Sequence, residues 1–330
     1  MMKKGKITAL ALTAMAAATV FAAGAQAKTI KLSTTKSTES YQYEALERFK
    51  AQVEEESGGE LVVELYPASQ LGGQNETIEG MEMGTIEMAY LSAGATEGFY
   101  PKSGLMGTLF TARDEDHALK IWKSEKGTEV VNEMIDSIGI RMLDFSIEGV
   151  RSVWSKSEIT GLDSLAGLKM RVPEVPMFIN TFTALGVNPT PMALSEVYTG
   201  LQTNIIDGLE YDLNGTIEYN FTDHCKYCYE TNHGVSIMAF MAGEIFWGGL
   251  TEEEQTIITD AAVKISAEMV EEYYTEVEES RKKLEEMGVT FVKPTDEERE
   301  HINELMTPII TDYIKDYATE EDLEALRAIE

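Results

Sequence analysis

The first part of the chain alternates two kinds of hydrophobic pattern. Apolar residues at every second position indicate a half-buried strand, whereas apolar residues every three or four positions indicate one face of a helix. The strands predicted in this way cover residues 29–33, 61–66 and 86–91, and the helices cover residues 41–56 and 74–83. Strands that alternate with helices predict an α/β domain with a largely parallel sheet.

The same alternation starts again near Val150 and predicts a second α/β unit. Its predicted strands lie at residues 150–154, around Arg171 and near Ile205, and its predicted helices cover residues 177–185 and 195–203. A segment leading to Thr231, Asn232 and His233 is a further predicted strand.

Residues 252–287 contain neither Gly nor Pro, and their apolar positions recur at helical spacing. They predict one long amphipathic helix, for which coiled-coil association is the general alternative. Residues 289–292 predict a returning strand, and amphipathic helices follow to the end of the chain.

The amino terminus has the features of an export signal. Lys3, Lys4 and Lys6 precede a small apolar stretch over residues 7–23, and the sequence Ala-Gln-Ala ends at Ala27. This pattern predicts a signal peptide cleaved after Ala27 and a periplasmic product. A membrane helix is the competing interpretation, but the stretch is short and rich in alanine. No cysteine follows it, which disfavours a lipid anchor.

The composition is strongly acidic: 57 Asp and Glu stand against 27 Lys and Arg, a formal charge of −30. Loss of the three amino-terminal lysines with the signal peptide makes this −33. Such a surface disfavours nucleic acid, whose phosphates need basic partners. It does not exclude a small anion, because surface charges are screened beyond ~8 Å at physiological salt, whereas a buried arginine acts at contact distance.

One arginine stands in a setting that suits an anion. Arg171 follows an apolar run and precedes Val172 and Pro173. The proline fixes its own φ and pushes Val172 toward extended geometry, so Arg171 is predicted to project from a rigid strand end. A guanidinium held there offers a planar fork of donors to a carboxylate. The alternative is an ion pair with a neighbouring acid of the protein.

Four sequence segments carry a family resemblance: LKMRVPEVP, LGVNPTPMALSEVYTGLQTNIIDGLE, TNH and, upstream, ELYPASQLGGQNETIEGMEMGTIEMAY. They resemble the solute-binding proteins of tripartite ATP-independent periplasmic (TRAP) transporters, which include C4-dicarboxylate and sialic-acid receptors. The resemblance spans nearly all of the chain after residue 27. It implies a monomeric ligand receptor without cofactor or metal, which delivers an organic acid to the small and large membrane subunits of a sodium-coupled transporter.

The resemblance also implies a fold, the two-domain periplasmic binding protein fold of the α/β class. A hinge and a long helix that spans both domains belong to this fold. Domain I is expected to contain residues 28–149 and about 238–276. Domain II is expected to contain residues 150–237 and about 277–330, with the ligand cleft between the two domains.

By the same resemblance, Arg171 is the principal carboxylate clamp and Arg151 is a second arginine of the site. Two guanidiniums that converge on one empty pocket repel each other, which favours an anionic ligand. The alternative for Arg151 is a structural ion pair with Glu148 or another acid.

Other positions depart from the sialic-acid receptor pattern. Glu210 is kept, but Tyr211 and Asp212 stand where the family commonly has Asn and Pro. Ser92 occupies a place where the sialic-acid receptors have a charged residue, and Leu194 replaces an aromatic residue. These differences argue against sialic acid as the ligand.

Gln74 and Thr35 are candidate hydrogen-bond donors to the ligand, or else a helix cap and a turn residue. Because Asp212 is costly beside a carboxylate unless it is paired, we expect it to face a hydroxylated or amino part of the ligand. A polyhydroxylated acid, such as a sugar acid or uronate, fits best. Dicarboxylates, amino-acid-like acids and aromatic acids remain open.

Two further interpretations concern other chemistry. Cys225 and Cys228, near His224 and His233, have the spacing of half a zinc site; a local disulfide and two ordinary thiols are the alternatives. An exported enzyme is a competing function, but none of the four histidines falls in a metal or triad motif.

A receptor for another importer or for a sensor kinase is the third candidate function, after the TRAP receptor and the exported enzyme.

Overall fold

Nine strands form one sheet in the computed structural model, which describes residues 27–107 and 109–330. The strand order is β2-β1-β3-β8-β4-β7-β5-β6, and β9 pairs with β8. The strands are β1 (Lys28–Thr34), β2 (Leu61–Tyr66), β3 (Met88–Ser92), β4 (Ile140–Ser155), β5 (Lys169–Val172), β6 (Asn188–Pro191), β7 (Gly208–Tyr211), β8 (Tyr227–Gly243) and β9 (Thr290–Val292).

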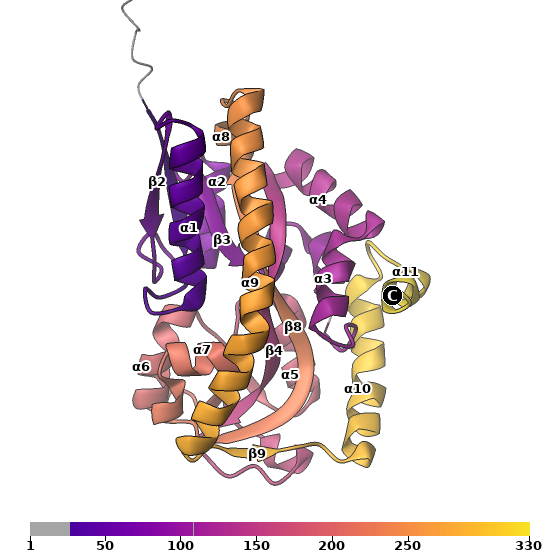
Figure 1. Ribbon diagram of the computed structural model, residues 1–330. Coiled ribbons are helices and arrows are strands. Elements are labelled where there is room, and N and C mark those ends of the chain that lie inside the picture. The colour runs from indigo at the N-terminus through magenta and orange to yellow at the C-terminus, as the bar shows by residue number, and fades with distance from the viewer. Residues whose placement is uncertain (1–26, 108) are drawn as a thin grey trace, which may run out of the picture.

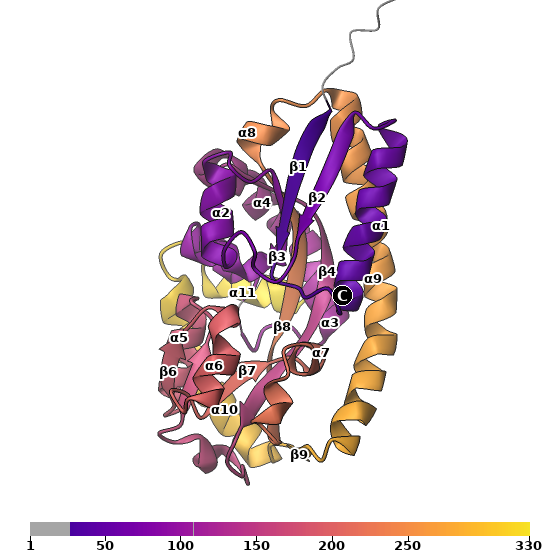
Figure 2. The same cartoon turned by 90° about the vertical axis from the view of Figure 1, so that its left-hand side faces the viewer.

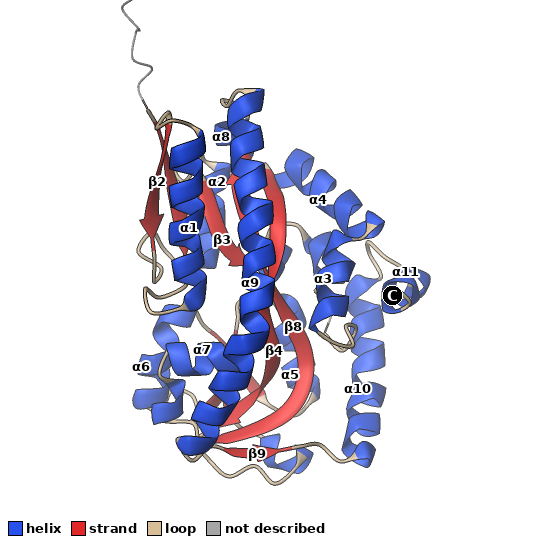
Figure 3. Ribbon diagram, in the orientation of Figure 1, coloured by secondary structure: helices blue, strands red, loops and turns tan. Residues whose placement is uncertain are grey.

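Helices cover the sheet on both sides (Figure 3). They are α1 (Tyr41–Glu56), α2 (Gln74–Glu82), α3 (Glu115–Lys123), α4 (Glu125–Ile138), α5 (Pro176–Ala184), α6 (Val197–Gln202), α7 (Leu213–Glu218), α8 (Glu244–Trp247), α9 (Glu252–Glu286), α10 (Asp296–Ile314) and α11 (Glu320–Arg327). Among the described residues, no helix is both long and apolar enough to cross a membrane. The predicted signal peptide falls on residues 1–27, of which 1–26 lie outside the described part.

The two ends of the sheet are parallel and its middle is antiparallel. Strand β1 pairs with β2 and β3 in parallel, and β5 pairs with β6 and β7 in parallel. Between them, β4 and β8 form a long antiparallel pair that runs through most of the molecule (Figure 1). The prediction of an α/β fold is therefore confirmed, although some bounds differ. Strand β4 begins at Ile140, ten residues before the predicted strand, and its pairing with β8 shifts register at three points, which interrupts the alternation of apolar positions. The strand predicted near Ile205 is β7, which begins at Gly208.

Helix α9 lies along one side of the molecule and passes both parallel ends of the sheet (Figures 1 and 2). Thr251 and Glu254 form a capping box at its start, which satisfies the first free backbone N–H groups. The helix packs on α1, α7 and β4. Its buried positions follow the predicted apolar face and include Ile258, Ala261, Ala262, Ile265, Met269 and Tyr273.

The predicted domain boundaries stay a prediction. Each of them, at residues 149/150, 237/238 and about 276/277, falls inside a long element: β4, β8 or α9. These three elements pass from one parallel end of the sheet to the other. A movement between the ends therefore has to bend them, because no loop connects the halves at these points.

Candidate functional site

A narrow cavity lies where β1, β3 and β5 end and face the middle of β4 and β8. Its volume is about 50 Å³, and a second cavity of about 20 Å³ shares part of its lining. Seven of the nine residues predicted from the sequence line the larger of these two cavities: Thr35, Gln74, Ser92, Arg151, Arg171, Leu194 and Tyr211. The space suffices for a few water molecules. The site is thus almost closed in this structure.

Arg171 lies on β5, directly before the Val172–Pro173 turn that the sequence predicts. Its side chain is buried, and its Nε donates to the backbone oxygen of Met192 at 3.0 Å. Within residues 27–107 and 109–330, no carboxylate forms an ion pair with it, and its two Nη atoms have no hydrogen-bond partner. Burial lowers the pKa of this guanidinium, because charge is disfavoured away from water. Arg171 is therefore a buried cation that lacks a counter-ion.

Arg151 lies on β4, and the protein itself occupies its donors. Its Nε and Nη2 donate to the two carboxylate oxygens of Glu210, the second at 2.6 Å, and its Nη1 donates to Ser236 Oγ at 2.8 Å. The guanidinium also lies over the rings of Tyr211 and Phe178, 4.9 and 5.3 Å from their centroids. Burial disfavours the charge, but Glu210 outweighs it and raises the pKa of Arg151.

Glu210 does not line the cavity, although the sequence placed it in the site. It is fully buried on β7, its carboxylate accepts two hydrogen bonds from Arg151, and His233 Nε2 lies 3.2 Å from its Oε2. His233 Nδ1 in turn lies 2.8 Å from Thr231 Oγ1. Burial lowers the pKa of His233, although Glu210 opposes this shift, so the environment favours the neutral ring. Glu210 and His233 thus hold Arg151 in place, and the ion pair between Arg151 and Glu148 is only a secondary contact at 3.8 Å.

Lys36 and Glu148 form a buried ion pair that the sequence did not reveal as part of the site. Lys36 Nζ lies 2.7 Å from Glu148 Oε1, and both side chains are at most 5% exposed. Glu148 lines the cavity, and Tyr211 donates to its Oε1 at 3.4 Å. Burial opposes ionisation, but Lys36 and Arg151 keep the pKa of Glu148 below its usual range. The only sequence signal for Lys36 was its place in the polar turn that follows the first strand.

Asp212 also lies outside the cavity, contrary to the expectation that it faces the ligand. Its Oδ1 caps α7 by accepting from the backbone N–H of Gly215 at 2.8 Å. Gly149 allows this packing, because a Cβ at that position would lie 2.7 Å from the Cβ of Asp212. Asp212 lines a different cavity, together with Glu115 and Tyr273. Burial raises the pKa of its carboxyl to about 7.

Two neutral residues of the cavity, Gln74 and Thr35, form hydrogen bonds within the protein. Gln74 begins α2, and its side-chain oxygen accepts from the backbone N–H of Ser92 at 3.2 Å, which leaves the amide NH₂ for another acceptor. The Thr35 backbone oxygen accepts from Tyr219 at 3.0 Å. Gln74 therefore does not cap its helix, which was the alternative for this residue.

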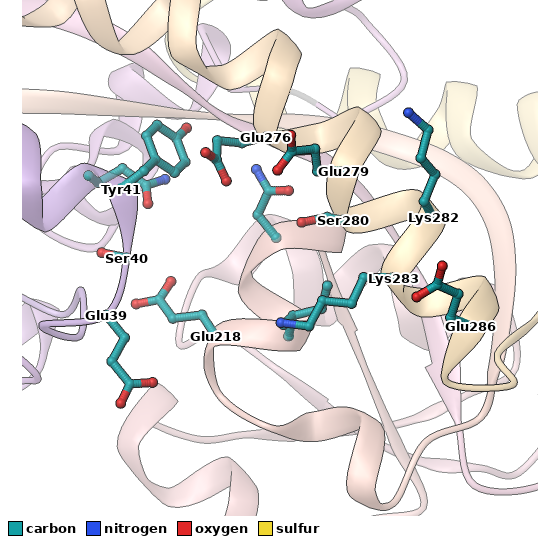
Figure 4. Close-up of a pocket in the computed structure, with 13 residues that line it drawn as sticks. Glu39, Ser40, Tyr41, Glu218, Glu276, Glu279, Ser280, Lys282, Lys283 and Glu286 are labelled. Carbon is teal, nitrogen blue, oxygen red and sulfur yellow. The ribbon is translucent and has the colours of Figure 1, made fainter.

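A much larger groove of about 480 Å³ lies at the surface between the start of α1, α7 and the second half of α9 (Figure 4). Figure 4 shows the carboxylates of Glu39, Glu218, Glu276 and Glu279 along it. Five glutamates and two lysines line the groove, so carboxylates outnumber ammonium groups there, and it is the less suitable place for an organic acid in spite of its size.

The cysteines lie apart from the cavity. Cys225 and Cys228 are buried free thiols, so they form no disulfide here. Burial raises the pKa of Cys225 to about 12, which disfavours the thiolate that zinc requires. His233 belongs to the Glu210 contacts described above. No cluster of three or more potential metal ligands occurs in the described part of the chain.

Comparison with known proteins gives consistent results over most of the chain. Residues 32–316 match the family described as bacterial extracellular solute-binding protein, family 7. A solute-binding protein of Roseobacter denitrificans is 32% identical over 86% of this chain and 87% of its own length. The sialic acid-binding periplasmic protein of Vibrio cholerae is 29% identical over 93% of this chain and 94% of its own length.

Solved structures give the same picture. The structure of a TRAP periplasmic solute-binding protein from Roseobacter denitrificans with bound L-galactonate has a TM-score of 0.82, at 28% identity over 91% of this chain and 98% of that one. Another, from Pseudomonas putida F1 with bound D-glucuronate, has a TM-score of 0.86, at 25% identity over 92% of this chain and 98% of that one.

Proposed function

The chain belongs to family 7 of the bacterial extracellular solute-binding proteins, and on this basis we propose that it is a periplasmic TRAP receptor for a sugar acid. In this proposal it binds one acid molecule and delivers it to the membrane subunits of a sodium-coupled TRAP transporter. It has no catalytic role. The ligands of its relatives, an aldonate and a uronate, support the choice of sugar acids over simple dicarboxylates.

The observation that carries the proposal is the buried guanidinium of Arg171. A buried cation without a counter-ion is unfavourable in the empty protein, and an anionic ligand removes that cost on binding. The planar fork can bind one carboxylate through two parallel hydrogen bonds. Arg171 is therefore the proposed carboxylate clamp, and the ligand enters as its counter-ion.

The other predicted residues receive supporting roles. Thr35, Gln74 and Ser92 supply neutral groups for ligand hydroxyls, whereas Leu194 and Tyr211 shape the walls. Arg151 contributes a positively charged guanidinium to the cavity wall. Glu210 holds this guanidinium in a fixed orientation and is therefore a positioning residue.

The small size of the cavity indicates how the ligand is bound, because the site has to open before a sugar acid can enter. Ligand pockets of drug-sized molecules are typically ~300–1,000 Å³, and the cavity here is far smaller. A sugar acid therefore enters when the two parallel ends of the sheet move apart and β4, β8 and α9 bend. The ligand then stabilises the closed form, which is population shift by a hinge movement.

A thermal-shift screen of the purified mature chain tests this function. Uronates and aldonates are expected to raise the melting temperature by mass action, whereas sialic acid and neutral sugars are not. Isothermal titration calorimetry then gives the affinity of each hit. A protein that no sugar acid stabilises would contradict the proposal.

Two further measurements separate the competing functions. Turnover of a bound acid, followed by mass spectrometry, favours the exported enzyme. Uptake that survives deletion of the TRAP membrane subunits favours a receptor for another importer or for a sensor. Mass spectrometry of the exported protein also tests cleavage after Ala27.

A further inference from the structure

Glu148 is an ionised group of the cavity wall whose role the carboxylate clamp does not explain. It lies on β4 and lines the same cavity as Arg171. Lys36 holds Oε1 at 2.7 Å, so that the carboxylate keeps a fixed position and its charge. The other oxygen, Oε2, lies 3.8 Å from Arg151 Nη1, and the Ser236 hydroxyl is a further hydrogen-bonding neighbour of the carboxylate. This buried, ionised carboxylate lines the cavity, where a ligand hydroxyl can approach it.

The chemistry of this carboxylate has two consequences for a bound acid. An ionised carboxylate accepts hydrogen bonds and donates none, so a ligand hydroxyl is a good partner for it. A second carboxylate of the ligand in the same place would face a like charge at contact distance, which is costly in a buried site. The cavity therefore offers one place for a carboxylate, at Arg171, and one place for a hydroxyl, at Glu148.

Resting on the proposed function, we propose that Glu148 is a specificity-determining residue, which restricts the site to hydroxylated monocarboxylates and excludes dicarboxylates. Uronates and aldonates carry one carboxylate and several hydroxyls. Aldarates carry a second carboxylate in place of the terminal hydroxyl or aldehyde group. The site is thus expected to separate two compounds that differ in oxidation at a single carbon.

Glu218 provides a matched control for this proposal. It is the other acid beside Lys36, at 3.8 Å, and its side chain is 7% exposed. It lies on the side of the surface groove, not in the cavity wall (Figure 4). A neutral substitution at Glu218 therefore removes the same charge from the same lysine without changing the cavity.

The test compares galactonate with galactarate by isothermal titration calorimetry on the wild-type chain, E148Q and E218Q. The wild type and E218Q are expected to bind galactonate at least 100-fold more tightly than galactarate. E148Q is expected to reduce this ratio at least tenfold, mainly through tighter binding of galactarate. An unchanged ratio in E148Q, or an equal reduction in E218Q, overturns the inference.

A second comparison uses only the wild-type chain and covers the case that E148Q does not fold. Glucuronate and glucarate replace the first pair of ligands, and the same preference for the monocarboxylate is expected. Equal affinities for both members overturn the specificity role but leave the receptor function intact. If neither a mono- nor a dicarboxylate sugar acid binds, the proposed function itself fails.

Discussion

The two arginine neighbourhoods of the cavity differ in what surrounds the charge. Arg151 has a bidentate carboxylate, a hydroxyl and two aromatic rings within contact. Arg171 has one backbone oxygen and no counter-ion among the residues that the structure describes. The paired guanidinium contributes to the fold, whereas the unpaired one is the proposed clamp for a ligand. Replacement of Arg171 is thus expected to reduce ligand affinity, whereas replacement of Arg151 is expected to reduce stability first.

The sequence suggested an anionic ligand because Arg151 and Arg171 would repel each other in an empty pocket. Two unpaired guanidiniums in one pocket would repel each other, but Glu210 compensates Arg151. The demand for an anion therefore comes from Arg171 alone. One uncompensated cation matches one carboxylate, which agrees with a ligand that carries a single acid group.

The largest expected effect belongs to Arg171→Ala. It removes two charge-assisted hydrogen bonds to the ligand, worth roughly 1.5–3 kcal/mol each, so affinity for a sugar acid falls at least 100-fold. Because Arg171 has no counter-ion in the empty protein, the ligand-free melting temperature stays the same or rises. Calorimetry and thermal unfolding measure the two effects. Unchanged affinity in the variant rejects Arg171 as the clamp.

Arg151→Ala is expected to reduce stability first. The substitution leaves the fully buried carboxylate of Glu210 without its partner, which typically costs about 3–5 kcal/mol. Urea unfolding of the ligand-free protein measures this loss. The double variant Arg151→Ala, Glu210→Gln is the control, and it should recover part of the stability because no charge is left unpaired. If Arg151→Ala instead keeps its stability but binds the ligand weakly, Arg151 has the same ligand-binding role as Arg171, and the difference proposed here is wrong.

Sequence reasoning succeeded where the signal was local. The predicted helix 41–56 has the same bounds as α1, and the proline after Val172 marked the strand end that carries Arg171. It could not name partners from far along the chain. An ion pair of Arg151 with an acid was one of its alternatives, but the acid is Glu210, 59 residues away, and the pair of Lys36 with Glu148 spans 112 residues. Pairing between strands brings such residues together, and no spacing rule reveals it.

Asp212 shows a second kind of failure. It stands in a segment of the family pattern where a ligand contact is common, directly after Tyr211, which does line the cavity. Strand β7 ends at Tyr211, however, and the chain turns there into α7. An aspartate at a strand-to-helix junction is a good N-cap, and this local role takes the side chain away from the ligand.

Asp212→Asn tests this placement through pH, with an effect of up to roughly 4 kcal/mol, because each pKa unit between the folded and the unfolded chain corresponds to about 1.4 kcal/mol. Asn also caps helices well, so the fold is kept. The folded chain raises the pKa of Asp212 to about 7, whereas the unfolded chain ionises it near pH 4. Between these values the folded state binds the extra proton, so this group makes the wild type lose stability as pH rises.

The variant lacks this loss. Its stability relative to the wild type is therefore expected to be nearly equal at pH 4, to increase up to pH 7 and to stay constant above it. Urea unfolding at several pH values measures the difference. Ligand affinity should change less than threefold, and a large loss of affinity would instead return Asp212 to the ligand site.

The smallest expected effect is the dependence of the ligand-binding rate constants on ionic strength. It distinguishes the influence of the charge on Arg171 from that of the net charge of the chain. The protein carries a formal charge of −30, so its long-range field slows the approach of an anion at low salt. Raising the ionic strength from about 0.01 to 0.15 M shortens the Debye length from ~30 to ~8 Å. The association rate constant in stopped-flow is thus expected to rise a few-fold. The dissociation rate constant should stay nearly constant, because the contact with buried Arg171 is poorly screened. A dissociation rate that follows salt as strongly would place the carboxylate at the surface, as in the acidic groove, and not on Arg171.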